Sequence, residues 1–126
     1  MIRWALIAWV VSIGAVWAEQ NVSIYPAAQC AAFWAGYADY ARASAHLEKN
    51  PGDDARADAF RAVALRLATA SPEEIDRHIA EQRPLMVSML DGVIRRGDGV
   101  SRRVFERLTK TCETFAATHP ETQALR

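Results

Sequence analysis

The segment SPEEIDRHIAEQRPLMVSMLDGVIRRG, from Ser71 to Gly97, decides the fold class of this chain. It opens with a helix-capping serine, a proline at the first helical position and a glutamate three residues after the cap. Its apolar side chains recur at helical spacing, and these are Ile75, Ile79, Met86, Met89, Leu90 and Val93. We therefore predict one amphipathic helix over 71–96, kinked but not broken at Pro84 and ended by Gly97.

Three further segments show the same helical periodicity, over about 26–48, over about 53–69, and from about Gly99 or Ser101 to Thr118. The first is followed by Lys49-Asn50-Pro51-Gly52, a run with strong turn chemistry. No alternating strand pattern of useful length occurs in the sequence. Because the intervening loops are short, the sequence predicts an all-α, up-down-up-down four-helix bundle.

Two cysteines lie far apart in the chain, Cys30 in the first predicted helix and Cys112 in the last. In an up-down-up-down bundle, the first helix starts at the same end at which the fourth helix finishes. We therefore predict a disulfide that joins Cys30 to Cys112. There is no Cys-x-x-Cys motif, no haem-attachment motif and no histidine at zinc-ligand spacing, so we expect neither a metal nor a cofactor.

Residues 1–18 have the pattern of a cleaved secretory signal peptide. Arg3 gives a positively charged start, an apolar run extends from Trp4 to Trp17, and cleavage is predicted between Ala18 and Glu19. The alternative is an uncleaved membrane anchor, but the apolar run is shorter than the roughly 20 residues that a spanning helix needs. We therefore expect a periplasmic or secreted protein.

Residues 19–126 are expected to form a single helical domain with loose ends at about 19–24 and 120–126. The whole chain has a formal net charge of +0, so it carries no basic surface suited to nucleic acid or to a membrane. Its 13 arginines against two lysines, together with 24 alanines, are typical of a GC-rich bacterial genome. That association favours the periplasm over other exported locations.

Glu74 and His78 stand four residues apart on the predicted third helix, where they could form an acid–base pair. The simpler interpretation is a solvated helix face, since charged pairs at this spacing are common on helices. Catalytic zinc requires three protein ligands, and no His-Glu-x-x-His motif is present. We therefore predict that the protein is not an enzyme.

Gln82 falls within the apolar stripe of the third helix, between Ile79 and Met86. Its amide could satisfy the carbonyl of Ala80, which loses its hydrogen bond because Pro84 has no N–H. The alternative is that Gln82 is the polar group of a ligand cavity beside Met86 and Met89. That alternative predicts a carrier of a small ligand or cofactor.

In the first predicted helix, the residues that recur at helical spacing and form its stripe are Phe33, Tyr37, Tyr40, Ser44 and Leu47. Trp34 lies about 90° from the centre of this apolar stripe, so we expect it at the boundary of the core. A partly exposed tryptophan is a good anchor for a protein partner. The plan of a helical bundle with one long-range disulfide is similar to that of small exported inhibitor or immunity proteins of bacteria. No functional residue carries over from this resemblance of plan. We expect a non-catalytic protein that binds another exported or envelope protein.

Overall fold

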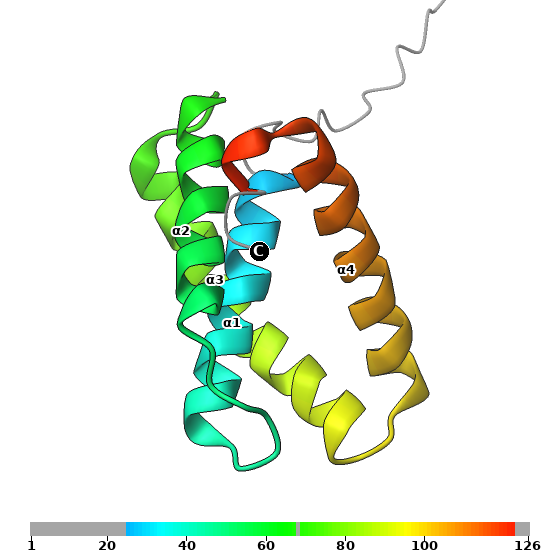
Figure 1. Cartoon of the computed structure of the whole chain (residues 1–126). Coiled ribbons are helices and arrows are strands. Elements are labelled where there is room, and N and C mark those ends of the chain that lie inside the picture. Colours follow the sequence, from blue (N-terminus) through cyan, green and yellow to red (C-terminus); the bar gives the residue numbers. More distant parts are fainter. Residues whose placement is uncertain (1–24, 68, 123–126) are drawn as a thin grey trace, which may run out of the picture.

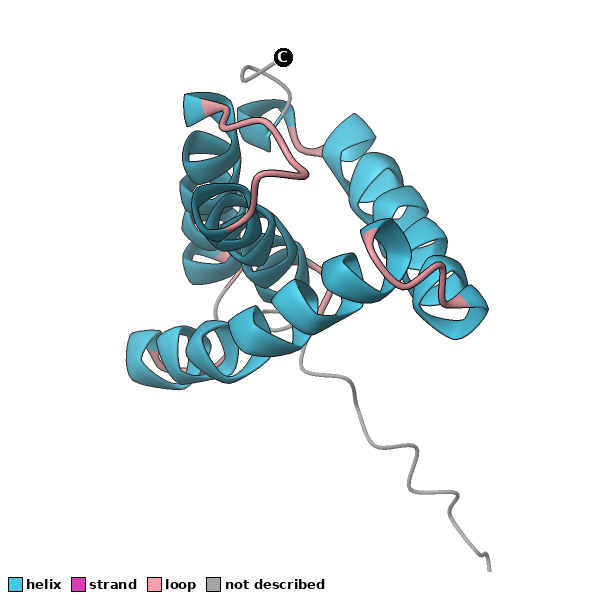
Figure 2. Cartoon of the chain, turned by 90° about the horizontal axis from the view of Figure 1, so that it is seen from below, coloured by secondary structure: helices cyan, strands magenta, loops and turns pink. Residues whose placement is uncertain are grey.

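The computed structural model describes residues 25–67 and 69–122. Its helices are α1 (Ala27–Ala43), α2 (Pro51–Arg66), α3 (Pro72–Ile94), α4 (Gly99–Thr118) and a short 3₁₀ helix, η1 (Pro120–Thr122). Figure 1 shows that α1 to α4 alternate in direction, and Figure 2 shows only helices and loops in the described part of the chain. The predicted all-α, up-down-up-down bundle is confirmed.

Local sequence signals set most of the helix starts. The Ser71 hydroxyl accepts a hydrogen bond from the Glu74 N–H at 3.2 Å, as the capping pattern predicts. Asn50 and Asp98 cap α2 and α4 in the same manner, and each such cap stabilises a helix by about 1 kcal/mol. Gly97 takes a φ of 61°, a left-handed conformation that glycine favours after a helix end. α3 continues without a break through Pro84.

The first helix is shorter than the predicted 26–48, because it ends at Ala43. Ser44 is extended, with φ −119° and ψ 142°, and its hydroxyl accepts a hydrogen bond from the His46 N–H. Such a local side-chain bond competes with helix continuation. Leu47, predicted on the apolar stripe of the helix, packs against the core from the loop instead. The other predicted bounds, 53–69 and 71–96, differ from α2 and α3 by two or three residues or fewer.

α1 is the central helix and contacts α2, α3 and α4. Its sequence is rich in alanine, so the neighbouring helices approach closely. A Cβ atom added to Gly36 would lie 2.5 Å from the Cβ of Met86, which shows how tightly α1 packs on α3. In contrast, no Cα of α2 lies within 8 Å of a Cα of α4 in these described helices. The two helices therefore flank α1 with their backbones apart and meet through side chains, as in Phe60 and Phe115, whose ring centroids are 5.9 Å apart.

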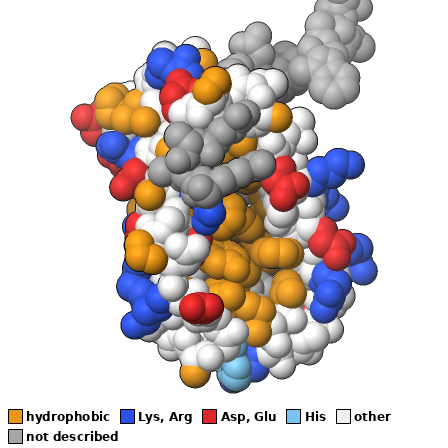
Figure 3. Space-filling model, in the orientation of Figure 1, with side chains coloured by type: hydrophobic (Ala, Val, Ile, Leu, Met, Phe, Trp, Pro, Cys, Tyr) orange, Lys and Arg blue, Asp and Glu red, His pale blue; other side chains and the backbone are white. Residues whose placement is uncertain are grey.

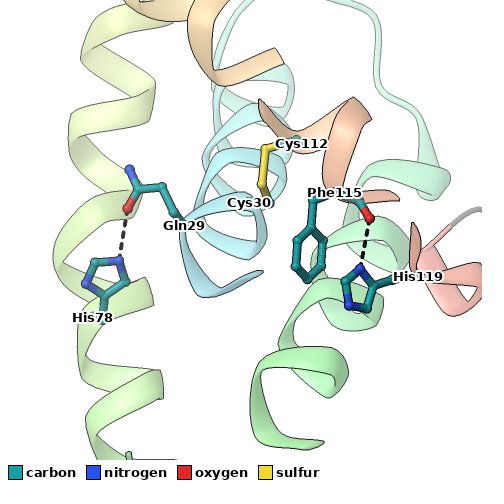
Figure 4. Close-up of a disulfide and its surroundings, with 6 residues drawn as sticks. All are labelled: Gln29, Cys30, His78, Cys112, Phe115 and His119. Atoms are coloured by element: carbon teal, nitrogen blue, oxygen red, sulfur yellow. Dashed lines mark hydrogen bonds between the residues drawn. A yellow bond between two sulfur atoms is a disulfide. The ribbon is translucent and has the colours of Figure 1, made fainter. Parts of the chain in front are cut away.

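The predicted disulfide is confirmed, with the Cα atoms of Cys30 and Cys112 5.6 Å apart. It joins the first turn of α1 to the C-terminal half of α4, and both cysteines are buried (Figure 4). Within α4 only Cys112 and Ala116 are fully buried. The disulfide is therefore the main anchor of α4 at this end of the bundle.

Two further sequence expectations concern the chain ends. Residues 120–122, expected within a loose end, form η1, where Thr122 is buried and its hydroxyl donates to the His119 carbonyl at 2.7 Å. The predicted signal peptide, its cleavage point and residues 19–24 lie outside the described residues. Of the helices that are described, none combines the length and apolar composition of a membrane span.

Candidate functional site: a groove between α2 and α4

A groove of about 830 Å³ lies between α2 and α4, and we call it the α2–α4 groove. Figure 3 shows it as a hollow with apolar side chains between the two helices. Its volume falls within the range of roughly 300–1,000 Å³ that is typical of ligand sites. Its lining residues come from α1, the α1–α2 loop, α2, α4 and η1: Trp34, Tyr37, Leu47, Glu48, Lys49, Asn50, Pro51, Asp53, Arg56, Phe60, Thr109, Cys112, Glu113, Ala116 and Thr122.

Two aromatic side chains of α1, Trp34 and Tyr37, line the groove. Both are half-buried, and their ring centroids are 5.5 Å apart. Phe33, which is fully buried beneath them, packs edge-on against Trp34 at 5.2 Å. Because their neighbours hold these rings in place, they present a pre-ordered apolar surface.

Asp53 is the most unusual residue of the groove, since this carboxylate is only 2 % exposed. Its Oδ1 accepts a hydrogen bond from the Arg56 guanidinium at 2.9 Å, whereas its Oδ2 has no partner. Burial raises the pKa of the Asp53 carboxyl, and the charge and hydrogen bond of Arg56 partly offset that effect. Asp53 lies in the first turn of α2, where the helix dipole also favours a negative charge.

Arg56 connects Asp53 to the aromatic surface. Its guanidinium carbon lies 4.8 Å from the centroid of the Trp34 ring, which is cation–π distance. The same guanidinium forms the ion pair with Asp53. The neighbouring Tyr37 has a raised pKa, mainly because of its burial and secondarily because of the Asp53 charge. These side chains form one electrostatic cluster on one wall and the base of the groove.

The opposite wall carries a second buried oxygen without a partner, Thr109 Oγ1 on α4. In the described part of the chain, Asp53 Oδ2 and Thr109 Oγ1 are the two buried side-chain oxygens or nitrogens that lack a hydrogen bond. Both residues line the same groove. Buried polar atoms are nearly always hydrogen-bonded in native proteins, so these two oxygens are exceptions within the described chain.

The sequence-predicted residues are distributed over different places. Trp34, the expected partner anchor, lies in the α2–α4 groove. Met86 and Met89 are buried in a core cluster with Phe33, Tyr40 and Leu90. A cavity for a small ligand beside these methionines stays a prediction.

Gln82 takes part in a polar chain between α1 and α3. Its Oε1 accepts a hydrogen bond from Gln29 Nε2 at 3.5 Å. Gln29 Oε1 in turn accepts one from His78 Nε2 at 2.9 Å, the bond drawn in Figure 4. His78 is thus bonded across the helix pair, and burial lowers its pKa while the Glu81 charge raises it. Glu74 is exposed. The described residues contain no group of three or more His, Cys, Asp or Glu side chains placed to hold a metal ion.

Asp53, Arg56 and Thr109 were not among the residues that sequence reasoning selected. The Asp53–Arg56 spacing of three residues is visible in the sequence, but it resembles any surface pair on a helix. Nothing in that spacing indicates that the Asp53 carboxylate is buried. Comparison with protein-family models, curated proteins and solved structures finds no match to this chain.

Proposed function

We propose that this chain is an exported, non-catalytic protein that binds a segment of another envelope or exported protein in the α2–α4 groove, as an inhibitor or immunity protein does. One observation carries the proposal. The groove presents a pre-ordered aromatic surface, the half-buried rings of Trp34 and Tyr37, beside the Asp53–Arg56 ion pair. A bound segment would cover these rings, and partly exposed tryptophan and tyrosine side chains are good anchors for a protein partner.

The charged residues around the groove also favour a protein partner. Glu48, Lys49 and Glu113 line it and are exposed, so charges of both signs surround the half-buried aromatic rings. An apolar centre within a polar rim is the usual anatomy of a protein interface. The disulfide holds α4 in place beside α1, which limits the entropy that a partner's binding would cost.

Export is the second element of the proposal. A structural disulfide is typical of oxidising compartments, and it supports the interpretation of residues 1–18 as a signal peptide cleaved before Glu19. N-terminal sequencing of the chain purified from the periplasm or medium would test this interpretation. A chain that begins at Glu19 supports it, and a cell-associated chain that retains residue 1 contradicts it.

Site-specific photo-cross-linking tests the groove directly. A photoreactive phenylalanine analogue replaces Glu113, an exposed residue of the groove wall, or Arg107, an exposed residue of α4 outside the groove lining. In the cells that export the protein, we expect a discrete cross-linked partner from position 113 and none from position 107. Adding Trp34→Ala should weaken the product at 113. Equal cross-linking from both positions would contradict binding in the groove.

A second candidate function is that of a small-ligand carrier, because the volume of the groove also suits a small molecule. Native mass spectrometry of the protein purified from its source compartment distinguishes the two functions. A retained small-molecule mass favours the carrier. A mass equal to that of the chain alone, together with a cross-linked protein partner, favours protein binding.

A further inference from the structure

The short helix η1 brings the chain to the α2–α4 groove after α4. It contacts both α2 and α4. Arg66 of α2 pairs with Glu121 at 2.6 Å, and the hydroxyl of the buried Thr122 donates to the His119 carbonyl at 2.7 Å. Thr122 is also one of the residues that line the groove. The residues that follow Thr122 in the sequence therefore start from the groove.

Four residues of the sequence follow Thr122, and they lie outside the described residues. We call them the 123–126 segment, and they are Gln123, Ala124, Leu125 and Arg126. An extended chain covers about 3.3–3.6 Å per residue, so this segment spans at most roughly 14 Å. The rise along α2 from Arg56, whose guanidinium lies over Trp34, to Arg66 is about 15 Å. With the reach of its side chains added, the segment is long enough to extend from η1 to the aromatic rings of the groove.

We propose that the 123–126 segment occupies the α2–α4 groove in the free protein, with the Leu125 side chain against the exposed parts of the Trp34 and Tyr37 rings. This contact goes beyond the proposed function, because it gives the groove an occupant from the chain itself. The consequence of the contact rests on the proposed function. A partner segment must displace the 123–126 segment before it can bind.

Leu125 suits the groove because its side chain is large and apolar. The rings of Trp34 and Tyr37 are half-buried, so part of each ring is accessible to it. Covering the rings with leucine removes apolar surface from water. The short connection to η1 also matters, since it gives the segment an effective concentration on the order of millimolar. A contact that is weak between separate molecules can therefore fill the groove of its own chain.

Charge favours the same occupant. Arg126 is the neighbour of Leu125 in the sequence, and Glu113 is an exposed carboxylate of the groove wall. An ion pair between Arg126 and Glu113 would be exposed to solvent and would contribute little. We therefore assign the main contact to Leu125 and not to Arg126.

The test is NMR spectroscopy of the full, disulfide-bonded chain with labelled leucine methyl groups. We expect nuclear Overhauser effects between the Leu125 methyls and the Trp34 or Tyr37 ring. Leu125→Asp, which places a charge against the rings, should shift the signal of the Trp34 indole N–H. Leu125→Met keeps an apolar side chain and should leave that signal nearly unchanged. Gln123→Asp is the matched control, because it adds the same charge within the segment and should preserve the contacts of Leu125.

A second measurement tests the competition with a partner. A segment that fills the groove lowers the apparent affinity of a partner in proportion to the fraction of chains whose groove is free. Leu125→Asp should therefore raise the yield of the cross-linked partner from position 113 several-fold. Leu125→Met should not raise it.

The possible failures separate this inference from the proposed function. If Leu125 shows no contact with Trp34 or Tyr37, occupation by the 123–126 segment is overturned, and a cross-linked partner from position 113 would still support the proposed function. If Leu125 contacts the rings but position 113 gives no partner even in Leu125→Asp, the proposed function is contradicted and the occupation stands. An unchanged yield in Leu125→Asp, with the contacts present in the unaltered protein, overturns the competition.

Discussion

The α1–α3 interface and the α2–α4 groove lie on the same central helix but differ in how their polar groups are paired. Between α1 and α3, Arg83 binds both oxygens of Asp39 at 2.8 and 2.9 Å, and the Tyr40 hydroxyl donates to Asp91 at 3.2 Å. In the groove, Asp53 and Thr109 each keep a buried oxygen without a partner. The polar groups of the first region are paired within the chain, whereas those of the second are paired only in part. That difference separates a structural interface from a candidate binding site.

The disulfide should give the largest effect, because it holds α4 beside the groove. Replacing Cys30 and Cys112 together by alanine should lower the free energy of unfolding by about 2–5 kcal/mol, measured by urea denaturation. Binding of a groove ligand should weaken as well, since α4 loses its main anchor. The single replacement Lys110→Ala, at an exposed position of α4, is the control. An unchanged unfolding midpoint in the double variant would show that packing alone holds α4.

Gly36→Ala tests the α1–α3 interface. The added methyl would lie 2.5 Å from the Cβ of Met86 and 3.0 Å from the Arg83 carbonyl oxygen, so α1 and α3 must separate. We expect a loss of about 1–3 kcal/mol in unfolding free energy. Gly99→Ala is the matched control, because its methyl would meet only an arginine side chain at 3.6 Å. Similar stabilities for the two variants would refute close packing between α1 and α3.

Two carboxylates, one from each region, should show opposite pH dependences. Arg83 hydrogen bonding lowers the pKa of Asp39, so Asp39 stabilises the fold above its unfolded-state pKa and loses that contribution as the pH falls through its folded-state pKa. Burial raises the pKa of Asp53, so the folded state binds its proton more tightly, and stability falls as the pH rises from the ordinary carboxyl range through the raised value.

The measurement is the free energy of unfolding of Asp39→Asn and Asp53→Asn across the acidic pH range. Relative to the unaltered protein, Asp39→Asn should lose about 0.5–1 kcal/mol near neutral pH, a small value because the ion pair is partly exposed, and lose less in acid. The unfolding free energy of Asp53→Asn should fall furthest below that of the unaltered protein in acid, and this difference should shrink as the pH rises. Parallel pH profiles for the two variants would contradict the contrast between the regions.

The smallest effect is expected at the end of the groove formed by η1. Arg66 and Glu121 form an ion pair at 2.6 Å, but both side chains are about half exposed. Arg66→Ala should therefore change the unfolding free energy by no more than about 0.5 kcal/mol. Thr122→Ala, which removes a buried hydroxyl that donates to the His119 carbonyl, should cost more. The reverse order would mean that the ion pair, rather than the buried threonine, holds η1.

Much of the fold could be predicted because its signals are local. The Ser71 cap, the stop at Gly97 and the apolar periodicity of α3 act within one helix and needed no tertiary information. The end of α1 could not be predicted in the same manner. Leu47 keeps the helical spacing of the apolar stripe, yet it reaches the core from a loop.

The candidate site was predictable only in part. The angular position of Trp34 indicated a boundary side chain, and Trp34 does line the groove. Asp53 gave no such signal, since an aspartate in the first turn of a helix is ordinarily a solvated charge that favours the helix dipole. The burial of this carboxylate, which is 2 % exposed, follows from the tertiary structure.

The amino-acid sequence by itself determined the helices, their alternating order and the pairing of Cys30 with Cys112, because periodicity, capping and alternating helix directions follow from short-range rules. The tertiary structure decided where the interface remains incomplete. α1 packs against its three neighbours, the backbones of α2 and α4 stay apart, and the buried Asp53 lines the groove between them. Burial and hydrogen-bond satisfaction depend on which surfaces come together in space, and no local pattern in the sequence records that.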